Sequence, residues 1–335
     1  MPFAPSRPTY LHTKEGFPVH RTKMTRVITV FGATGLQGGA VVRHLSKLGE
    51  YSIKAVTRNP PSEPAQRLAD LPNVTVVVAD LGKKETLLPA IKGSEAVFAI
   101  TNFYDSDVQE DLFREVRQGC TLADVALEAG TELLIWSGVP SALVRSGGKY
   151  KSNNLVENKN TIAQYLDYRG VPHVKLNVGF YLDNWVATYL NGMIHGALKR
   201  DNDGTIILTQ PMLKPEAKQG MIWVEKDLGP VVAAVLANWR QKPDLLGQTV
   251  WAAFDHVCMA DVVAEIKKQT GSEVRLDTPA TTGIADLDEL YGYENEWGVL
   301  TDVPLPDPLT TSLGVKFHGL ADWVVEDVVP AMKES

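Results

Sequence analysis

Three equally spaced glycines, Gly32, Gly35 and Gly38, are the residues of this chain that most directly indicate chemistry. Gly32 permits a sharp turn, Gly35 lets backbone N–H groups approach a pyrophosphate, and Gly38 lets a following helix pack close to the preceding strand. The phosphates would then lie at the positive end of that helix. The spacing therefore predicts a dinucleotide-binding turn, and an ordinary strand-to-helix turn is the alternative.

The residues on either side of the glycines favour the first interpretation. Residues 27–31 form a short apolar run rich in β-branched and aromatic side chains, which is typical of a buried parallel strand. Residues 40–48 are predicted to form a helix that ends at Gly49. A strand, a glycine turn and a helix in this order are the context that a dinucleotide site requires.

Arg58 follows the next predicted strand, residues 52–57. An NAD-specific site usually has Asp or Glu at this point, where its carboxylate binds the ribose 2′-hydroxyl. A guanidinium suits a 2′-phosphate instead, because it can form two charged hydrogen bonds with it. Arg58 therefore predicts NADP(H) as the cofactor, with a solvated surface arginine as the alternative.

Further candidate residues follow the later predicted strands. The carboxyl ends of parallel strands meet at one edge of a sheet, and the ligand crevice forms there. We expect Asp80 and Leu81 to contact the adenine, and Thr101 and Asn102 to lie beside the cofactor. Ser137 also ends a strand, where it is either a turn former or a catalytic donor.

The first half of the chain alternates strands and helices, which predicts an α/β fold with a Rossmann-type doubly wound parallel sheet. The predicted strands are residues 27–31, 52–57, 74–78, 95–100, 132–137 and 173–178. The predicted helices are residues 40–48, 84–91, 107–129 and 155–168. We assign residues 25–178 to this nucleotide-binding domain.

The pattern is looser after residue 179. Helices are predicted at residues 185–198, 231–239, 259–270 and 320–329, and extended segments at 205–209, 222–224 and 249–253. We expect residues 179–335 to form a smaller C-terminal α/β lobe that closes the cleft on the substrate side and is partly interleaved with the first domain. Residues 1–24 contain several prolines and no apolar periodicity, so a flexible N-terminal extension is favoured over a transit peptide.

The composition is typical of a soluble globular protein, with 335 residues, 44% of them hydrophobic and 22% charged. A net charge of −7 argues against direct nucleic-acid binding, and the longest apolar run, residues 231–237, is too short to span a membrane. Cys120 and Cys258 are too few for a disulfide framework and lack the neighbours of a metal site. We expect two buried thiols, no metal, and a reducing compartment, namely the cytoplasm with the nucleus as a second location.

Five short segments, in this order along the chain, identify a resemblance: GATGLQGG (32–39), VTRNP (56–60), TNFY (101–104), WSG (136–138) and GFYLDN (179–184). They resemble the NmrA-like family of atypical short-chain dehydrogenase/reductase proteins, over about residues 25–330. This family includes the fungal nitrogen regulator NmrA and the NADPH-sensing HSCARG proteins. The resemblance implies a Rossmann domain that binds NADP(H) and a small C-terminal lobe over the ligand cleft.

The resemblance also implies roles for individual residues. It implies a phosphate loop made of Gly32, Thr34, Gly35, Leu36, Gln37 and Gly38. It implies Arg58 as the contact of the 2′-phosphate. It implies a nicotinamide-side wall made of Asn102, Lys159, Tyr181 and Asn184.

The chain departs from ordinary short-chain dehydrogenases at the proton donor. Those enzymes use Tyr-x-x-x-Lys on one helix, where the lysine lowers the pKa of the tyrosine. Here Leu155 stands four residues before Lys159, and the only Tyr-x-x-x-Lys begins at Tyr10, before the fold. Lys159 either holds a ribose or a substrate carbonyl, as in the isoflavone-reductase-like enzymes with their lone lysine, or is an exposed helix lysine.

Two functions therefore remain open. The first, favoured because the tyrosine is missing, is an NADP(H)-sensing regulator with little or no catalysis that passes cofactor occupancy to a partner protein. The second is an NADPH-dependent reductase of an apolar or aromatic small molecule that uses Lys159. Its pocket would be lined by aromatic side chains, with core packing as their alternative role: Phe103, Tyr104, Phe180, Tyr181, Trp185 and Tyr189.

Overall fold

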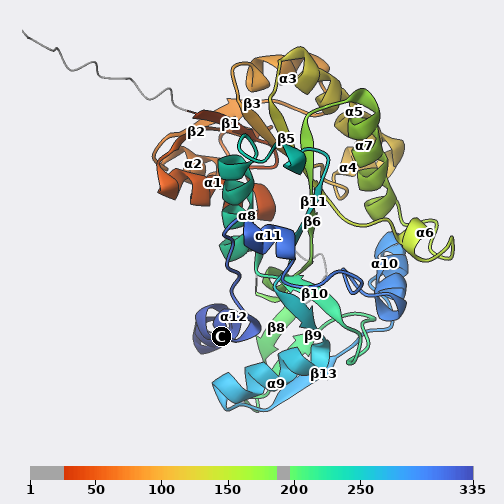
Figure 1. Cartoon of the computed structure of the whole chain (residues 1–335). Coiled ribbons are helices and arrows are strands. Elements are labelled where there is room, and N and C mark those ends of the chain that lie inside the picture. The colour runs from red at the N-terminus through yellow and green to blue at the C-terminus, as the bar shows by residue number, and fades with distance from the viewer. Residues whose placement is uncertain (1–25, 187–196, 335) are drawn as a thin grey trace, which may run out of the picture.

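The computed structural model describes residues 26–186 and 197–334, which are built around a seven-stranded parallel sheet (Figure 1). Its strands lie in the order β11-β6-β5-β4-β1-β2-β3. Their bounds are β1 Arg26–Val30, β2 Tyr51–Thr57, β3 Val74–Val78, β4 Ala96–Ala99, β5 Leu133–Gly138, β6 His173–Val178 and β11 Thr249–Ala252. The strand order reverses between β1 and β4, which is where a doubly wound sheet opens its ligand crevice. The predicted Rossmann-type fold is confirmed.

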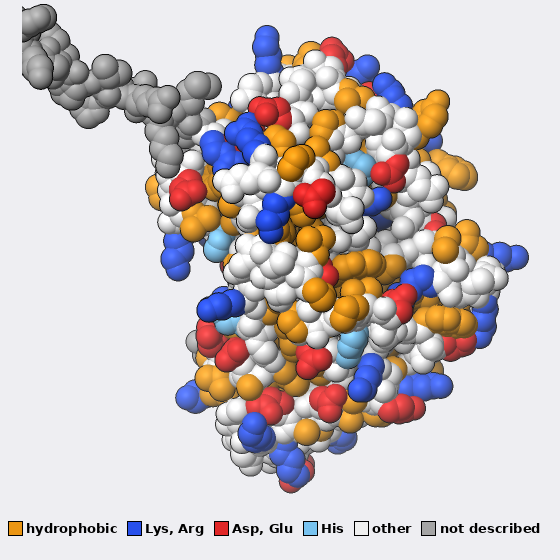
Figure 2. All heavy atoms as spheres, viewed as in Figure 1, with side chains coloured by type: hydrophobic (Ala, Val, Ile, Leu, Met, Phe, Trp, Pro, Cys, Tyr) orange, Lys and Arg blue, Asp and Glu red, His pale blue; other side chains and the backbone are white. Residues whose placement is uncertain are grey.

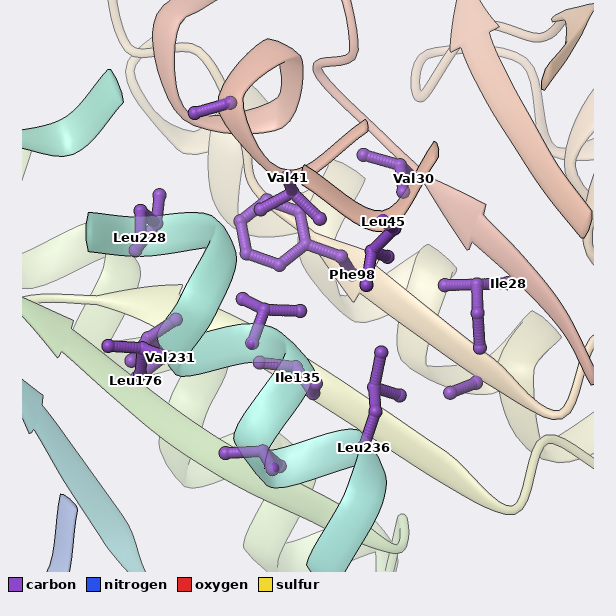
Figure 3. Close-up of a cluster of buried hydrophobic side chains, with 14 of the residues drawn as sticks. Ile28, Val30, Val41, Leu45, Phe98, Ile135, Leu176, Leu228, Val231 and Leu236 are labelled. Atoms are coloured by element: carbon purple, nitrogen blue, oxygen red, sulfur yellow. The ribbon is translucent and has the colours of Figure 1, made fainter. Parts of the chain in front are cut away.

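Helices cover both faces of this sheet. On one face, α1 (Leu36–Leu48) and α8 (Val224–Asn238) bury Val41, Leu45 and Val231 against strand residues such as Ile28 and Phe98 (Figure 3). On the other face lie α3 (Lys84–Ile91), α5 (Phe113–Glu128) and α7 (Asn154–Arg169), which contribute to a separate buried cluster. Burial on both faces explains why the central strand β4 is apolar throughout.

Two helices that are distant in sequence pack closely on the first face. A Cβ atom on Gly229 of α8 would lie 2.3 Å from the Cβ of His44 on α1, so only glycine fits there. The first sheet thus takes α8 and β11 from the second half of the chain, and α11 (Pro308–Ser312) packs against β11.

The rest of the second half forms two three-stranded sheets around a second buried cluster. One sheet contains β7 (Phe180–Tyr181), β10 (Gln219–Ile222) and β12 (Asp255–Val257), and the other contains β8 (Ala197–Arg200), β9 (Ile206–Thr209) and β13 (Val274–Asp277). They are accompanied by α9 (Met259–Thr270), α10 (Ala285–Glu296), α12 (Leu320–Trp323), a π-helical turn (Val324–Val328) and α13 (Val329–Glu334). Short helices at α2 (Glu63–Ala69), α4 (Ser106–Glu110), α6 (Ala142–Arg145), Leu182–Trp185 and Pro243–Leu245 complete the described elements.

The single helix predicted at residues 107–129 is wrong, because Asp111 divides it into α4 and α5. Asp111 has an extended backbone, and its carboxylate accepts a hydrogen bond from the N–H of Phe113 at 3.2 Å. Asp111 is the C-cap residue of α4, and a side chain that bonds a backbone N–H two residues later competes with continuation of the helix.

The helix predicted at residues 231–239 begins earlier than expected, at Val224, and the strand predicted at 222–224 ends at Ile222. The carboxylate of Asp183 accepts hydrogen bonds from the N–H groups of Val224 at 2.7 Å and Glu225 at 3.0 Å. This cap comes from a distant part of the chain, so the local sequence gives no sign of it.

Some predictions fall wholly or partly outside the described residues. Residues 1–24 lie outside them, and so does most of the helix predicted at 185–198, of which Trp185 ends a 3₁₀ helix and the last two residues belong to β8. Cys258 is a buried free thiol as expected, whereas Cys120 is only half-buried. In the described ranges, no helix combines the length and the apolar character needed to cross a bilayer. Acidic and basic side chains are intermixed on the face shown in Figure 2.

Candidate functional site

A cavity of about 770 Å³ lies at the carboxyl ends of the first sheet and extends under the second half of the chain. Segments that follow six of the parallel strands line it, as expected for a crevice at the topological switch point. All the residues predicted to contact a cofactor lie in its wall: Gly32, Thr34, Gly35, Leu36, Gln37, Gly38, Arg58, Asp80, Leu81, Thr101, Asn102, Lys159, Tyr181 and Asn184. The fold therefore brings them into one site.

The three glycines of the turn meet different demands. Gly32 has a φ of +64°, and a Cβ there would lie 2.6 Å from Cγ2 of Ile100. A Cβ on Gly38 would lie 2.3 Å from the carbonyl oxygen of Gly32. For Gly35 the nearest atom would be 3.4 Å away, which is an ordinary contact. The fold itself thus requires Gly32 and Gly38, whereas Gly35 leaves room on the cavity side.

Gly35 is also the N-cap residue of α1, and it has no side chain that could satisfy the first amides of that helix. The helix begins at Leu36, in the cavity wall. Free N–H groups at a helix N-terminus, together with the helix dipole, favour an anion such as a pyrophosphate.

The side chain of Gln37 joins three elements at the cavity wall. Ser137 at the end of β5 donates to Oε1 of Gln37 at 2.6 Å, and Nε2 of Gln37 donates to the Tyr181 hydroxyl at 2.5 Å. Burial raises the pKa of Tyr181 to about 12. Ser137 is therefore a hydrogen-bond donor to Gln37. Because both ends of the Gln37 side-chain amide already have partners, its backbone N–H is more readily available to a phosphate than its side chain.

Arg58 lies at the rim of the cavity and forms an ion pair with Asp105. The arginine side chain is 56% exposed, whereas the aspartate side chain is 9% exposed. Asp105 also caps α4 by accepting a hydrogen bond from the N–H of Asp107 at 3.2 Å. A 2′-phosphate at Arg58 would therefore approach a guanidinium that already has a carboxylate partner.

Two of the predicted contact residues shape the turns that carry them. Oδ1 of Asp80 accepts a hydrogen bond from the N–H of Gly82 at 2.9 Å, and Oδ1 of Asn102 accepts one from the N–H of Tyr104 at 3.1 Å. These bonds fix the loops after β3 and β4, which carry part of the cavity wall.

Lys159 of α7 is largely buried in a polar cluster, so the alternative of an exposed helix lysine is wrong. Its side chain is 13% exposed, and Nζ donates to Oε1 of Glu115 at 2.7 Å. Nζ also donates to Oγ1 of Thr101 at 3.1 Å and to the carbonyl oxygen of Thr101 at 3.2 Å. The second carboxylate oxygen of Glu115 accepts a hydrogen bond from Asn158 at 3.1 Å. The ammonium thus has a partner for each of its three protons.

Four of the six aromatic residues expected around a substrate do line the cavity, namely Phe103, Tyr104, Phe180 and Tyr181. Trp185 is instead packed in the second buried cluster, where its indole N–H donates to Gln210 at 3.0 Å. Tyr189 lies outside the described residues.

Helix α10 supplies a part of the wall that the sequence analysis missed. Its side chains at Leu287, Leu290, Tyr291, Tyr293 and Glu294 line the cavity. Positions 287, 290, 291 and 294 follow the spacing i, i+3, i+4 and i+7, which is the pattern of one helix face. This spacing is the feature of the sequence from which a helix with one face towards the cavity could have been predicted.

Glu294 is the most unusual of these residues. It is 4% exposed, and within residues 26–186 and 197–334 its Oε2 atom has no hydrogen-bond partner. Burial raises its pKa to about 8, so the side chain is mostly a neutral carboxylic acid at pH 7. Burial also raises the pKa of the neighbouring Tyr291 and Tyr104.

Comparisons with known proteins agree with this fold. The oxidoreductase hkm9 of Aspergillus hancockii, named as containing an NmrA-like family domain, is 26% identical over 309 residues, which cover 87% of this chain and 89% of that protein. NmrA, a negative transcriptional regulator solved in complex with NADP, matches with a TM-score of 0.74 at 18% identity, over 92% of this chain and 97% of NmrA. The triphenylmethane reductase of Citrobacter sp., solved with NADP(H), matches with a TM-score of 0.65 at 18% identity, over 90% and 99% of the two chains.

The family assignment rests on a match that covers most of the sequence. Residues 24–285 match the model of the NmrA-like family. This range contains the glycine turn, Arg58, Lys159 and all seven strands of the first sheet. The resemblance seen in the five short segments is confirmed, and the chain belongs to the NmrA-like family.

Proposed function

We propose that this protein binds NADP(H) in the cavity at the carboxyl edge of its first sheet. The pyrophosphate would lie on the glycine turn and the N-terminus of α1, and the 2′-phosphate would lie beside Arg58. Asp80 and Leu81 would contact the adenine. Thr101, Asn102, Tyr181 and Asn184 would border the nicotinamide. Support comes from the fit between these residues and the cofactor, and from the NADP(H) complexes of NmrA and of triphenylmethane reductase.

Bound NADPH supplies a hydride, and we infer that the protein is a reductase of a small, apolar or aromatic molecule. The observation that carries this inference is the continuity of the cavity. One hollow runs from the glycine turn to aromatic and aliphatic side chains from α10 and β7. Apolar walls with a few polar groups are typical of small-molecule sites. The oxidoreductase name of the relative hkm9, which aligns over most of both chains, supports the same function.

An NADP(H)-sensing regulator is the second candidate, and the surroundings of Lys159 favour it. All three protons of its ammonium are directed to Glu115 and Thr101, and Leu155 stands where the usual tyrosine would be. The similarity to NmrA, a negative transcriptional regulator, points the same way.

The experiment that separates the two candidates is NADPH oxidation by the purified full-length chain against a panel of aromatic ketones, quinones and enones. A reductase should turn over at least one of them, at a rate that disappears in Gly35→Val. A regulator should bind NADP(H) without turnover, and its capture of a partner protein should depend on the cofactor. Failure of NADP(H) to bind at all, measured by calorimetry, would refute both candidates.

A further inference from the structure

The end of the cavity under α10 contains a carboxyl group that the cofactor proposal does not use. We propose that Glu294 binds, as a neutral carboxylic acid, an acceptor atom of an uncharged apolar ligand, and so selects ketone, quinone or similar oxygens. This inference rests on the proposed function, because it takes this end of the cavity as the substrate side. It names the chemical class of that substrate.

The first support is the unsatisfied state of the Glu294 carboxyl. The residue lines the cavity and is almost completely buried, and Oε2 has no hydrogen-bond partner among the residues that the structure describes. Buried polar atoms in proteins nearly always have a partner, so a carboxyl group in the cavity wall with an unpartnered oxygen is a candidate for bonding a ligand in the cavity. A carboxylic acid there has one O–H to donate.

The second support is the character of the groups around Glu294. Tyr291 and Tyr293 come from α10 itself, and Tyr104 comes from the loop after β4. The pKa of each tyrosine is raised, with burial as the largest cause, so all three are neutral near pH 7. Arg145 of α6, a cation on a neighbouring element, acts on Tyr293 and forms an ion pair with Asp302. Burial alone accounts for the raised pKa of Glu294.

These surroundings decide which ligand fits. A neutral acid donates to a carbonyl or quinone oxygen, whereas an ammonium ligand would require the ionised carboxylate. An anionic ligand would be disfavoured beside a buried carboxyl in an apolar wall, because Arg145, a cation in the cavity wall, already forms an ion pair with Asp302. An uncharged aromatic molecule with one acceptor oxygen therefore matches both the acid and the wall.

Two probes with the same ring test this selection, 2-acetonaphthone as the uncharged ketone and 2-(aminomethyl)naphthalene as the cation. Their affinities for the full-length chain are measured by calorimetry between pH 6.5 and pH 9, with and without saturating NADP⁺. With a pKa of about 8 for Glu294, the fraction of the side chain that is the neutral acid falls roughly tenfold between pH 7 and pH 9. The affinity for the ketone should therefore fall by up to about that factor. The amine should bind more weakly than the ketone at pH 7.

Variants at position 294 separate the hydrogen bond from the packing. Glu294→Gln keeps a donor, so it should bind the ketone with no dependence on pH over this range. Glu294→Leu removes the donor and should weaken ketone binding at pH 7 by roughly 3- to 10-fold. Glu296→Gln changes an exposed carboxylate on the same helix and should behave like the unaltered protein.

The proposal is overturned if the ketone fails to bind, if its affinity is independent of pH in the unaltered protein, or if the amine binds more tightly at pH 7. A second readout needs no ligand. Infrared difference spectra between the unaltered protein and Glu294→Gln should show a protonated carboxyl band at pH 7, and its absence would also refute the proposal. The affinity for NADP(H) should be the same in both proteins, so a loss of cofactor binding in the unaltered protein would count against the proposed function and not against Glu294.

Discussion

The ammonium of Lys159 lies 2.7 Å from a carboxylate oxygen of Glu115, whose side chain is fully buried. This ion pair joins α7 to α5 at the cavity wall, and the two hydrogen bonds to Thr101 connect it to the end of β4. A charge at this depth is tolerated only when it has a partner. Lys159 therefore has a structural role in the site, in addition to any contact that it makes with a ligand.

We expect Lys159→Ala and Glu115→Ala each to lower the free energy of unfolding by roughly 3–5 kcal/mol, because each leaves one buried charge uncompensated. The double variant Glu115→Leu, Lys159→Met replaces the pair with apolar side chains and should lose much less than the sum. Urea unfolding of the single and double variants measures the coupling. Additive losses would show that the two charges do not stabilise each other.

This pair also determines how a kinetic test of Lys159 must be designed. A rate lost in Lys159→Ala combines the removal of an ammonium with a disturbed helix packing. Lys159→Arg keeps the positive charge near Glu115, so it is the better variant for separating a chemical role from a structural one.

The glycine turn gives the second prediction. Gly35→Val should abolish NADP(H) binding and leave the unfolding free energy nearly unchanged, since no protein atom would lie closer than 3.4 Å to a Cβ at that position. Gly38→Ala should instead destabilise the fold, because its Cβ would meet the Gly32 carbonyl oxygen at 2.3 Å. Calorimetric titration and thermal unfolding of both variants distinguish the two effects. Retained cofactor affinity in Gly35→Val would mean that the phosphates do not lie on this turn.

The parts of the fold that could be predicted from the sequence are those encoded by local patterns. The strand at residues 74–78 and the helices at 84–91 and 259–270 have the predicted bounds, because each has a clear apolar pattern and a defined end. The start of α8 could not be predicted, because the cap of that helix is the distant Asp183.

The specificity prediction at Arg58 depends on Asp105. We expect Arg58→Ala to weaken NADP(H) by roughly tenfold or more relative to NAD(H), because it removes a charged hydrogen bond to the 2′-phosphate. Asp105→Asn should have the opposite effect and strengthen NADP(H) binding relative to NAD(H). It removes the negative charge beside the phosphate, frees the guanidinium, and keeps a side-chain oxygen that can cap α4.

Titration of both cofactors into both variants and the unaltered protein measures this preference. The key quantity is the ratio of the NADP(H) and NAD(H) dissociation constants at fixed ionic strength, because charged contacts weaken as salt is added. An unchanged ratio in Arg58→Ala would remove Arg58 from the 2′-phosphate site.

The candidate site shows the same division between what could and could not be predicted. The residues after the parallel strands could be predicted because strand ends share one edge of the sheet. Glu294 could not be identified from its residue type, because a glutamate on a helix is usually exposed. Only the packing of α10 over the cavity buries it, and that packing joins segments far apart in the chain.

The last prediction concerns the pH dependence of stability, which tests the state of Glu294 without a ligand. Its folded pKa of about 8 lies above the ordinary value of 4.5. Between these values the folded protein keeps a proton that the unfolded chain has released, so the stability contributed at low pH is lost as pH rises towards 8. The slope from this group is up to about 1.4 kcal/mol per pH unit.

Glu294→Gln lacks this titration, so its stability relative to the unaltered protein should rise between pH 5 and pH 8 and level off above pH 9. Asp183 and Asp227, whose pKa values burial raises to about 6, contribute equally to both proteins and cancel in the difference. Glu296→Gln is the control. The pKa of that exposed carboxyl is lowered by Lys149 and Tyr150, so its variant should show a flat difference over the same range. Urea unfolding at one-unit pH intervals measures both differences, and parallel curves for Glu294→Gln and the unaltered protein would mean that Glu294 ionises near its ordinary pKa.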